Sequence, residues 1–140
     1  MVDVGILARM NPVTNANAAV DNGDRQLQNL RNDKQQLEQE VQQLQSDAGD
    51  LRQTAVIQSQ TDDAVLQASA VNSRRNVSQL KREAGRKQTE LSQIESQIQK
   101  LEAALGGLRQ ALHTYELDPE NPKYGAELDG AAKGVLRYTA

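Results

Sequence analysis

Positive charge is concentrated in one short segment of this 140-residue chain. Between residues 74 and 87 the only acidic residue is Glu83. Closely spaced lysines and arginines can contact nucleic-acid phosphates, which requires point charges rather than a shaped pocket. The net charge of −3 and the lack of nearby aromatic side chains argue against this partner, and acidic residues earlier in the chain could neutralise the segment. The sequence therefore favours a partner other than nucleic acid, and the candidate phosphate contacts are Arg74, Arg75, Lys81, Arg82, Arg86 and Lys87.

The residue types needed for catalysis or metal binding are scarce. His113 is the single histidine, and a helix would bring Glu116 within its reach, but no second imidazole or activated nucleophile accompanies this pair. Cysteine is absent, so neither a thiolate metal site nor a disulfide can form. The glycines match neither a P-loop nor a dinucleotide-binding motif. We therefore expect no enzymatic activity, cofactor, bound metal or small-molecule substrate.

Composition limits how the chain can bury apolar surface. Aromatic residues make up 2% of it, with no Phe or Trp, whereas charged residues make up 25%. Compact domains of this size depend on aromatic side chains for core volume, since each can bury about 150–250 Å². No apolar run approaches the roughly 20 residues that span a bilayer. These features predict a soluble protein in which helices bury their apolar stripes against one another.

A first apolar stripe follows Asn11 and Pro12, a pair typical of a helix start. Apolar residues then recur at intervals of three, four and seven, as in the a and d positions of a coiled coil. The stripe predicts a first helical arm over residues 12–58. Gly23 and Lys34 occupy two of its core positions, so we expect an imperfect arm that is weakest around Gly23.

A second and longer stripe predicts another helical arm over residues 64–117. It keeps one heptad register for five or more repeats, with polar residues on the other faces. Lys87 is its one charged core position. The helix-packing seam predicted from both stripes comprises Leu37, Val41, Leu44, Leu51, Val77, Leu80, Leu91, Ile94, Ile98, Leu101, Leu105, Leu108 and Leu112.

The two stripes differ in register by one residue near position 60. A turn at residues 59–63, with Ser59 or Thr61 capping the second helix, would explain the shift and fold the chain into a long antiparallel helical hairpin. The alternative is one continuous coiled-coil rod that absorbs the shift as a skip, and the absence of Gly and Pro between Leu51 and Ala84 favours it. We prefer the hairpin, because it sets an acidic first arm against a basic second arm.

A hairpin centred between residues 60 and 61 predicts which side chains face each other. It places Ala55 opposite Leu66, and Lys34 opposite Lys87. Two antiparallel heptad stripes align equally well when the centre of the turn moves by half a heptad. The stripes therefore allow more than one register of the hairpin. A single seam of mostly Leu, Ala and Val is marginal alone, and we expect the chain to oligomerise or to dock on another protein.

Both ends of the chain differ from the arms. Pro119 and Pro122 should end the second helix, because each disfavours helix in the residue before it. The C-terminal tail at residues 118–140 contains glycine and proline, and residues 135–138 suggest a short strand or a helical turn. Neither this tail nor the N-terminal segment at residues 1–11 can build a core, so we expect short irregular segments that anchor the chain to a partner.

Two segments are rich in small and amide side chains: residues 14–20 and the Gln-rich residues 35–45. In this composition the chain resembles the small helical coiled-coil structural proteins of tailed-phage virions. The resemblance includes no diagnostic motif, so no family residues are carried over. The resemblance implies a non-enzymatic structural or assembly protein of a virion that contacts copies of itself or neighbouring structural proteins. The alternative is a cytoplasmic coiled-coil binding module, either a chaperone-like clamp or a nucleic-acid-associated accessory.

Overall fold

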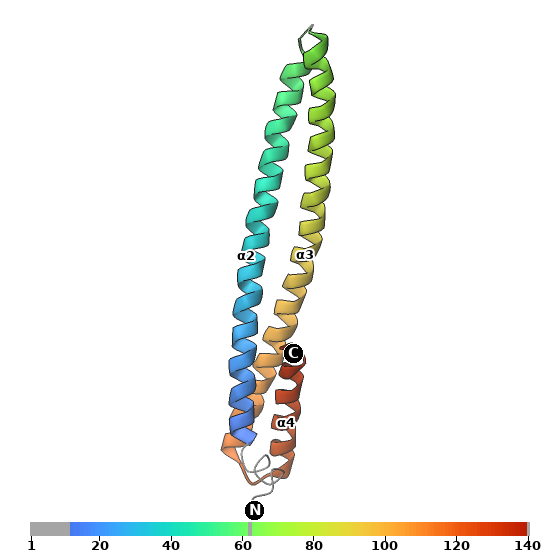
Figure 1. Ribbon diagram of the computed structural model, residues 1–140. Helices are drawn as coiled ribbons and strands as arrows, with labels where there is room; N and C mark the ends of the chain where they lie inside the picture. The colour runs from blue at the N-terminus through green and yellow to red at the C-terminus, as the bar shows by residue number, and fades with distance from the viewer. Residues whose placement is uncertain (1–11, 62, 140) are drawn as a thin grey trace, which may run out of the picture. The chain divides into compact units, whose positions relative to one another are not determined.

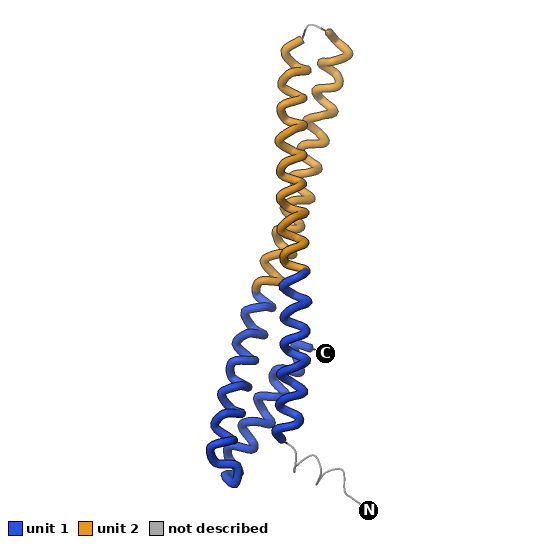
Figure 2. The backbone as a smooth tube through the Cα atoms, turned by 90° about the vertical axis from the view of Figure 1, so that its left-hand side faces the viewer, with its two compact units in different colours: residues 1–32, 96–140 blue, residues 33–95 orange. Residues whose placement is uncertain are grey.

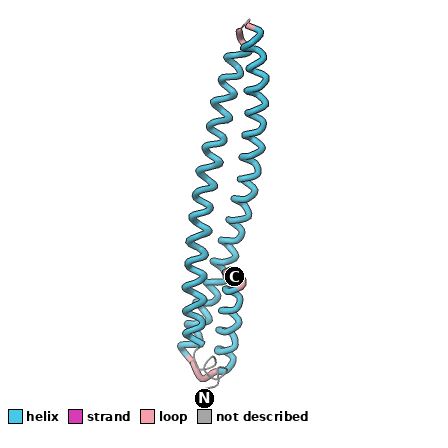
Figure 3. The backbone as a smooth tube through the Cα atoms, viewed as in Figure 1, coloured by secondary structure: helices cyan, strands magenta, loops and turns pink. Residues whose placement is uncertain are grey.

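The structure is a computed structural model that describes residues 12–61 and 63–139. Within these ranges the chain forms three α-helices and no strand: α2 over Pro12–Ser59, α3 over Ala64–Leu117 and α4 over Pro122–Leu136 (Figures 1 and 3). The all-α class is therefore confirmed. The anchoring segment expected at residues 1–11 lies outside the described residues.

Helices α2 and α3 form an antiparallel helical hairpin, which confirms the preferred fold over the continuous rod (Figure 1). The chain divides into two compact units (Figure 2). Of the described residues, unit 1 contains 12–32 and 96–139, and unit 2 contains 33–61 and 63–95. Stretches of α2 and α3 therefore pack on each other in both units, whereas α4 belongs to unit 1 alone.

The turn of the hairpin is held by side chains that cap the two helices. The Asp63 carboxylate accepts a hydrogen bond from the Val65 N–H at 2.9 Å, and the Thr61 hydroxyl accepts one from the Asp63 N–H at 3.0 Å. Asp63 thus caps α3, and the prediction that Ser59 or Thr61 does so is wrong. A carboxylate is suited to this position because it also complements the helix dipole. Ser59 instead donates to the Val56 carbonyl at 2.8 Å, at the end of α2.

The seam of unit 2 is narrow and built largely from small side chains. Its buried residues are Val41, Ala48, Ala55, Ala70, Ser73, Val77, Ala84 and Leu91. Alanine allows two helices to approach closely but buries little apolar area, which stabilises by roughly 25 cal/mol per Å². Ser73 keeps its hydroxyl satisfied by donating to the Gln58 side-chain oxygen at 3.0 Å. Unit 2 thus has a thin core along the facing sides of its two helices.

Ion pairs in unit 2 define the register of the hairpin. Lys87 Nζ lies 2.8 Å from a Glu40 carboxylate oxygen, and Lys34 Nζ lies 3.9 Å from one of Glu95. The predicted layer of Lys34 with Lys87 is therefore wrong, since α3 is displaced along α2 by about seven residues, one heptad, from that alignment. The apolar stripes fit after such a shift too, but the observed register gives each lysine a carboxylate and keeps the two positive charges apart.

Unit 1 has a larger core to which three helices contribute. Its fully buried large side chains are Leu101, Leu105, Leu108, Leu128 and Val135. The first three belong to α3 and the last two to α4, and α2 adds buried alanines. The third helix shields apolar surface that a two-helix seam would leave in contact with water.

The prediction of an irregular C-terminal tail is wrong. Asn121 caps α4 by accepting a hydrogen bond from the Lys123 N–H at 3.0 Å, and Pro122 begins the helix. Proline is well tolerated there, because an N–H at the start of a helix has no partner within it. The tail also buries Leu128 and Val135 inside unit 1, so it packs on its own chain.

Gly23 also differs from the prediction. It is buried in unit 1, beside Leu105 of α3 and Val135 of α4. The sequence identifies this position as a gap in the first stripe, but the missing side chain leaves room for the two neighbouring ones. The expected weak point is therefore a contact to which all three helices contribute.

Candidate functional site: the apolar tip of the hairpin

The predicted seam residues pack between helices of the same chain. Buried are Val41, Val77, Leu91, Ile98, Leu101, Leu105 and Leu108, and half-buried are Leu37, Leu44, Leu51, Leu80, Ile94 and Leu112. Neighbouring helices shield these side chains from water. A partner would therefore have to contact other surfaces of the protein.

Exposed large apolar side chains gather around the turn of the hairpin. In unit 2 they are Val56 and Ile57 at the end of α2 and Val65, Leu66 and Val71 at the start of α3, and we call these five residues the apolar tip. Ile57 and Val65 are the most open, with 69% and 72% of their surface exposed. Among the other described residues of unit 2, neither arm exposes a large apolar side chain.

Helical periodicity explains why α2 exposes its last apolar residues. Ala55 occupies the seam and is buried, so Val56 and Ile57 are rotated by about 100° and 200° away from it. Gln58 returns to the seam, where it accepts the hydrogen bond from Ser73. Adjacent residues of a helix cannot both face one partner helix. The sequence contains this signal, but the seam prediction omits both residues.

On α3 the exposure of the tip has a different cause. Leu66 has the phase of a seam residue, yet α2 ends before it can cover this position, and 40% of Leu66 is exposed. The predicted layer of Ala55 with Leu66 is therefore wrong, and Ala70 is the first buried residue of α3. Val65 and Val71 lie outside the seam phase. The register of the hairpin thus leaves the first turn of α3 uncovered.

A shallow hollow on α2 adjoins the apolar tip. Arg52, Gln53, Val56 and Ile57 line it, as two neighbouring pairs one helical turn apart. Its apolar side chains are thus flanked by a guanidinium and an amide. An apolar centre with a polar rim is the usual anatomy of a protein–protein interface.

The candidate phosphate contacts fall into two groups. Lys87 is half-buried and donates a hydrogen bond to Glu40. This bond holds the pKa of the Glu40 carboxyl below its ordinary value and raises the pKa of the Lys87 ammonium. The other five are exposed and take part in no ion pair among the described residues: Arg74, Arg75, Lys81, Arg82 and Arg86. The acidic arm α2 therefore pairs with Lys87 and not with the rest of this segment.

The remaining polar residues form no further candidate site. His113 and Glu116 are both exposed on α3. In residues 12–61 and 63–139, no group of three or more His, Asp or Glu side chains is placed to hold a metal ion, and no helix is long and apolar enough to cross a membrane. Comparison of the chain with protein-family models, curated proteins and solved structures gives no match. The functional evidence is therefore the geometry of the chain itself.

Proposed function

We propose that this chain is a non-enzymatic structural or assembly protein, a helical-hairpin subunit of a larger complex whose apolar tip binds a neighbouring subunit. The observation that carries the proposal is the concentration of exposed large apolar side chains around the turn of the hairpin. Exposed apolar residues are normal when they are scattered singly, whereas a group of them marks an interaction surface. Among the described residues of unit 2, every exposed large apolar side chain belongs to the tip.

The arms of unit 2 support a different role for the rest of the hairpin. Their outward faces carry amide, hydroxyl and charged side chains, which keep them hydrated. Hydrogen bonds between side chains one turn apart, such as Gln36 to Glu40 and Gln43 to Asp47, stabilise α2 locally. The arms are therefore suited to present the tip rather than to bind an apolar partner along their length.

The partner we propose for the tip is a second copy of this chain. Branched aliphatic side chains are self-complementary, so two tips related by a twofold axis can bury the same residues against one another. In a particle, neighbouring structural proteins would be further partners. The resemblance to tailed-phage structural proteins supports a virion as that particle.

Lysines placed at the tip test the proposal. We expect Ile57→Lys/Val71→Lys to sediment at a lower mass than the unmodified chain, whose monomer is 15.4 kDa. Like charges facing each other across a twofold axis repel, and burying them would be costly. Circular dichroism should show unchanged helicity, because both positions are exposed and lysine is a good helix former.

The matched control is Gln42→Lys/Gln88→Lys, which adds the same charge at two exposed positions on the arms. It should assemble as the unmodified chain does, because neither position belongs to the tip. A chain that stays monomeric at every concentration tested, or a tip variant that assembles unchanged, would contradict the proposal.

A further inference from the structure

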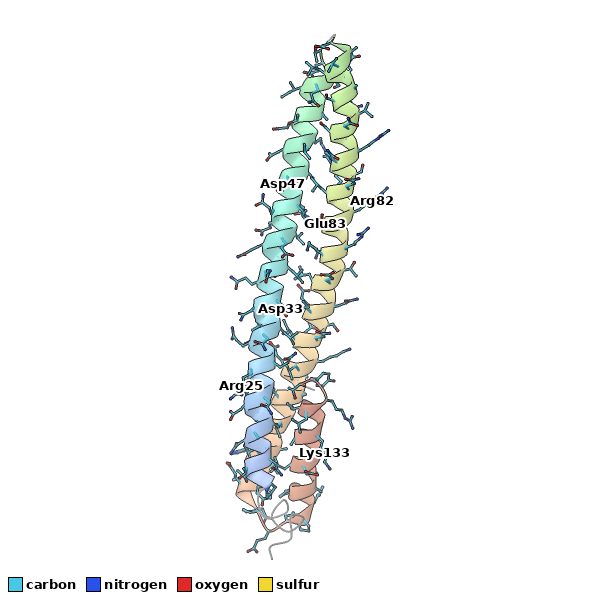
Figure 4. All side chains as sticks on the ribbon, in the orientation of Figure 1. Arg25, Asp33, Asp47, Arg82, Glu83 and Lys133 are labelled. Atoms are coloured by element: carbon cyan, nitrogen blue, oxygen red, sulfur yellow. The ribbon has the colours of Figure 1, made fainter. Side chains whose placement is uncertain are left out.

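Three arginines of α3 share one exposed face in unit 2. Arg75, Arg82 and Arg86 are spaced by seven and four residues, which places them within about 40° of one another around the helix. The buried seam residues Val77 and Ala84 lie on roughly the opposite side. Figure 4 shows Arg82 directed away from α2. We call Arg75, Arg82 and Arg86 the arginine stripe.

No ion pair neutralises the positive charge of the arginine stripe among the described residues. Glu40 of α2 is engaged by Lys87, on the seam side of α3. Glu83 lines a shallow hollow together with Gln79 and two arginines of the stripe, but it forms no ion pair among the described residues. Three guanidinium groups are therefore available along about 17 Å of helix, at a rise of about 1.5 Å per residue.

We infer that the arginine stripe binds the phosphate backbone of double-stranded nucleic acid without reading its sequence. Guanidinium groups form bidentate hydrogen bonds with phosphate oxygens, and their planar fork suits this contact better than an ammonium does. A duplex carries one negative charge for about every 1.7 Å of its axis, so a row of this length meets several phosphates. The stripe does not include the apolar tip, and this inference does not depend on the proposed assembly function.

The surroundings of the stripe favour a duplex over other polyanions. A helix that lies on an anionic membrane carries a row of apolar side chains beside its basic ones. Here one exposed valine, Val71, precedes Arg75 by a helical turn, and α3 exposes no other large apolar residue before Leu117. Single strands are usually held by stacking on aromatic side chains, and the three tyrosines of the chain, Tyr115, Tyr124 and Tyr138, all belong to unit 1. The stripe offers positive charge, which suits the regularly spaced phosphates of a duplex.

Binding of this kind has a characteristic salt dependence. Each phosphate contact contributes about 0.9 to the slope of log affinity against log salt, so three contacts should weaken duplex binding about forty-fold between 50 and 200 mM salt. The net charge of −3 should keep the affinity modest. Fluorescence anisotropy with a labelled DNA duplex of arbitrary sequence measures both quantities on the full chain.

Removing the stripe tests the inference directly. Arg75→Gln/Arg82→Gln/Arg86→Gln keeps helix-forming side chains at three exposed positions, so the fold should be retained, as circular dichroism can verify. We expect at least an about tenfold loss of duplex affinity at 50 mM salt and the disappearance of most of the salt dependence.

The matched control is Arg25→Gln/Lys100→Gln/Lys123→Gln, which removes the same charge from three exposed positions that also lack ion pairs among the described residues. It should bind the duplex within about twofold of the unmodified chain. An equal loss in this control would overturn the inference. So would an unmodified chain that fails to bind at 50 mM salt up to about 100 µM, the weak end of non-specific affinities. Binding to vesicles of phosphatidylserine and phosphatidylcholine as tight as to the duplex would assign the stripe to a membrane instead.

Discussion

A β-carbon placed on Gly23 would lie 2.6 Å from Cδ2 of Leu105, closer than such atoms approach in proteins. It would also lie 3.0 Å from Cγ1 of Val135. Leu105 and Val135 are fully buried, and protein interiors are closely packed, so we expect a shift of either side chain to disturb its neighbours. Gly23 of α2 is therefore needed for the contact that α3 and α4 make at this point of unit 1.

Alanine at position 23 should destabilise the protein. Overpacking costs about 1–3 kcal/mol, offset by up to about 1 kcal/mol from the better helix propensity of alanine. Gly85→Ala is the matched control, because a β-carbon there meets nothing within 4 Å, and it should stabilise the chain by about 0.5–1 kcal/mol. Urea unfolding followed by circular dichroism measures both variants. Equal stabilisation by the two alanines would show that Gly23 is not closely packed.

Crosslinking can test the register of unit 2. The side chains of Glu40 and Lys87 meet at 2.8 Å, so Glu40→Cys/Lys87→Cys should be joined within one chain by a short bis-maleimide. The residues of the pair Val41→Cys/Leu80→Cys face each other in the register centred between residues 60 and 61. In the observed register they are offset by about 10 Å along the helices, so this pair should react poorly. Because the chain contains no other cysteine, mass spectrometry gives the two yields without interference. The reverse order of yields would favour that other register.

The Glu40–Lys87 pair should make stability depend on pH. The pKa of Glu40 lies below its ordinary value of 4.5, so its stabilising contribution is present above pH 4.5 and is lost as the pH falls through the lowered pKa. The pKa of Lys87 lies above its ordinary value of 10.5, so its contribution is present below pH 10.5 and is lost as the pH rises through the raised pKa. The unmodified chain and Glu40→Gln should therefore differ most in Tm between these limits. A difference that stays constant as the pH falls well below 4.5 would argue against the pair.

Packing rather than helix propensity should hold α4 in place, because three of its fifteen residues are glycine. Leu128→Ala should lower the free energy of unfolding by about 2–5 kcal/mol, since Leu128 is fully buried. Leu136→Ala on the same helix is the control, and with 42% of that side chain exposed it should cost about 0.5 kcal/mol or less. Chemical unfolding of both variants gives the comparison. Similar losses for the two would mean that α4 does not rely on Leu128 for docking.

Part of the candidate site follows from the sequence, and part depends on the register of the hairpin. Val56 and Ile57 are adjacent and apolar at the end of a helix, so exposure of one of them follows from helical periodicity alone. The exposure of Leu66 does not, because it has the phase of a seam residue and is uncovered only by the register of the hairpin. The same register decides that Lys87 has a carboxylate partner while the arginine stripe has none.

The tertiary structure decided that the two arms fold back as a hairpin and do not continue as one rod. The sequence by itself determined that this chain forms two long helices with one apolar edge each. That information is local, since residues three and four apart fall on one face of any helix. The tertiary structure decided which residues face each other, that Gly23 makes room for two other helices, and that the C-terminal tail forms α4 on its own chain. A repeating stripe fits its partner at several offsets, and the choice among them depends on contacts between residues far apart in sequence.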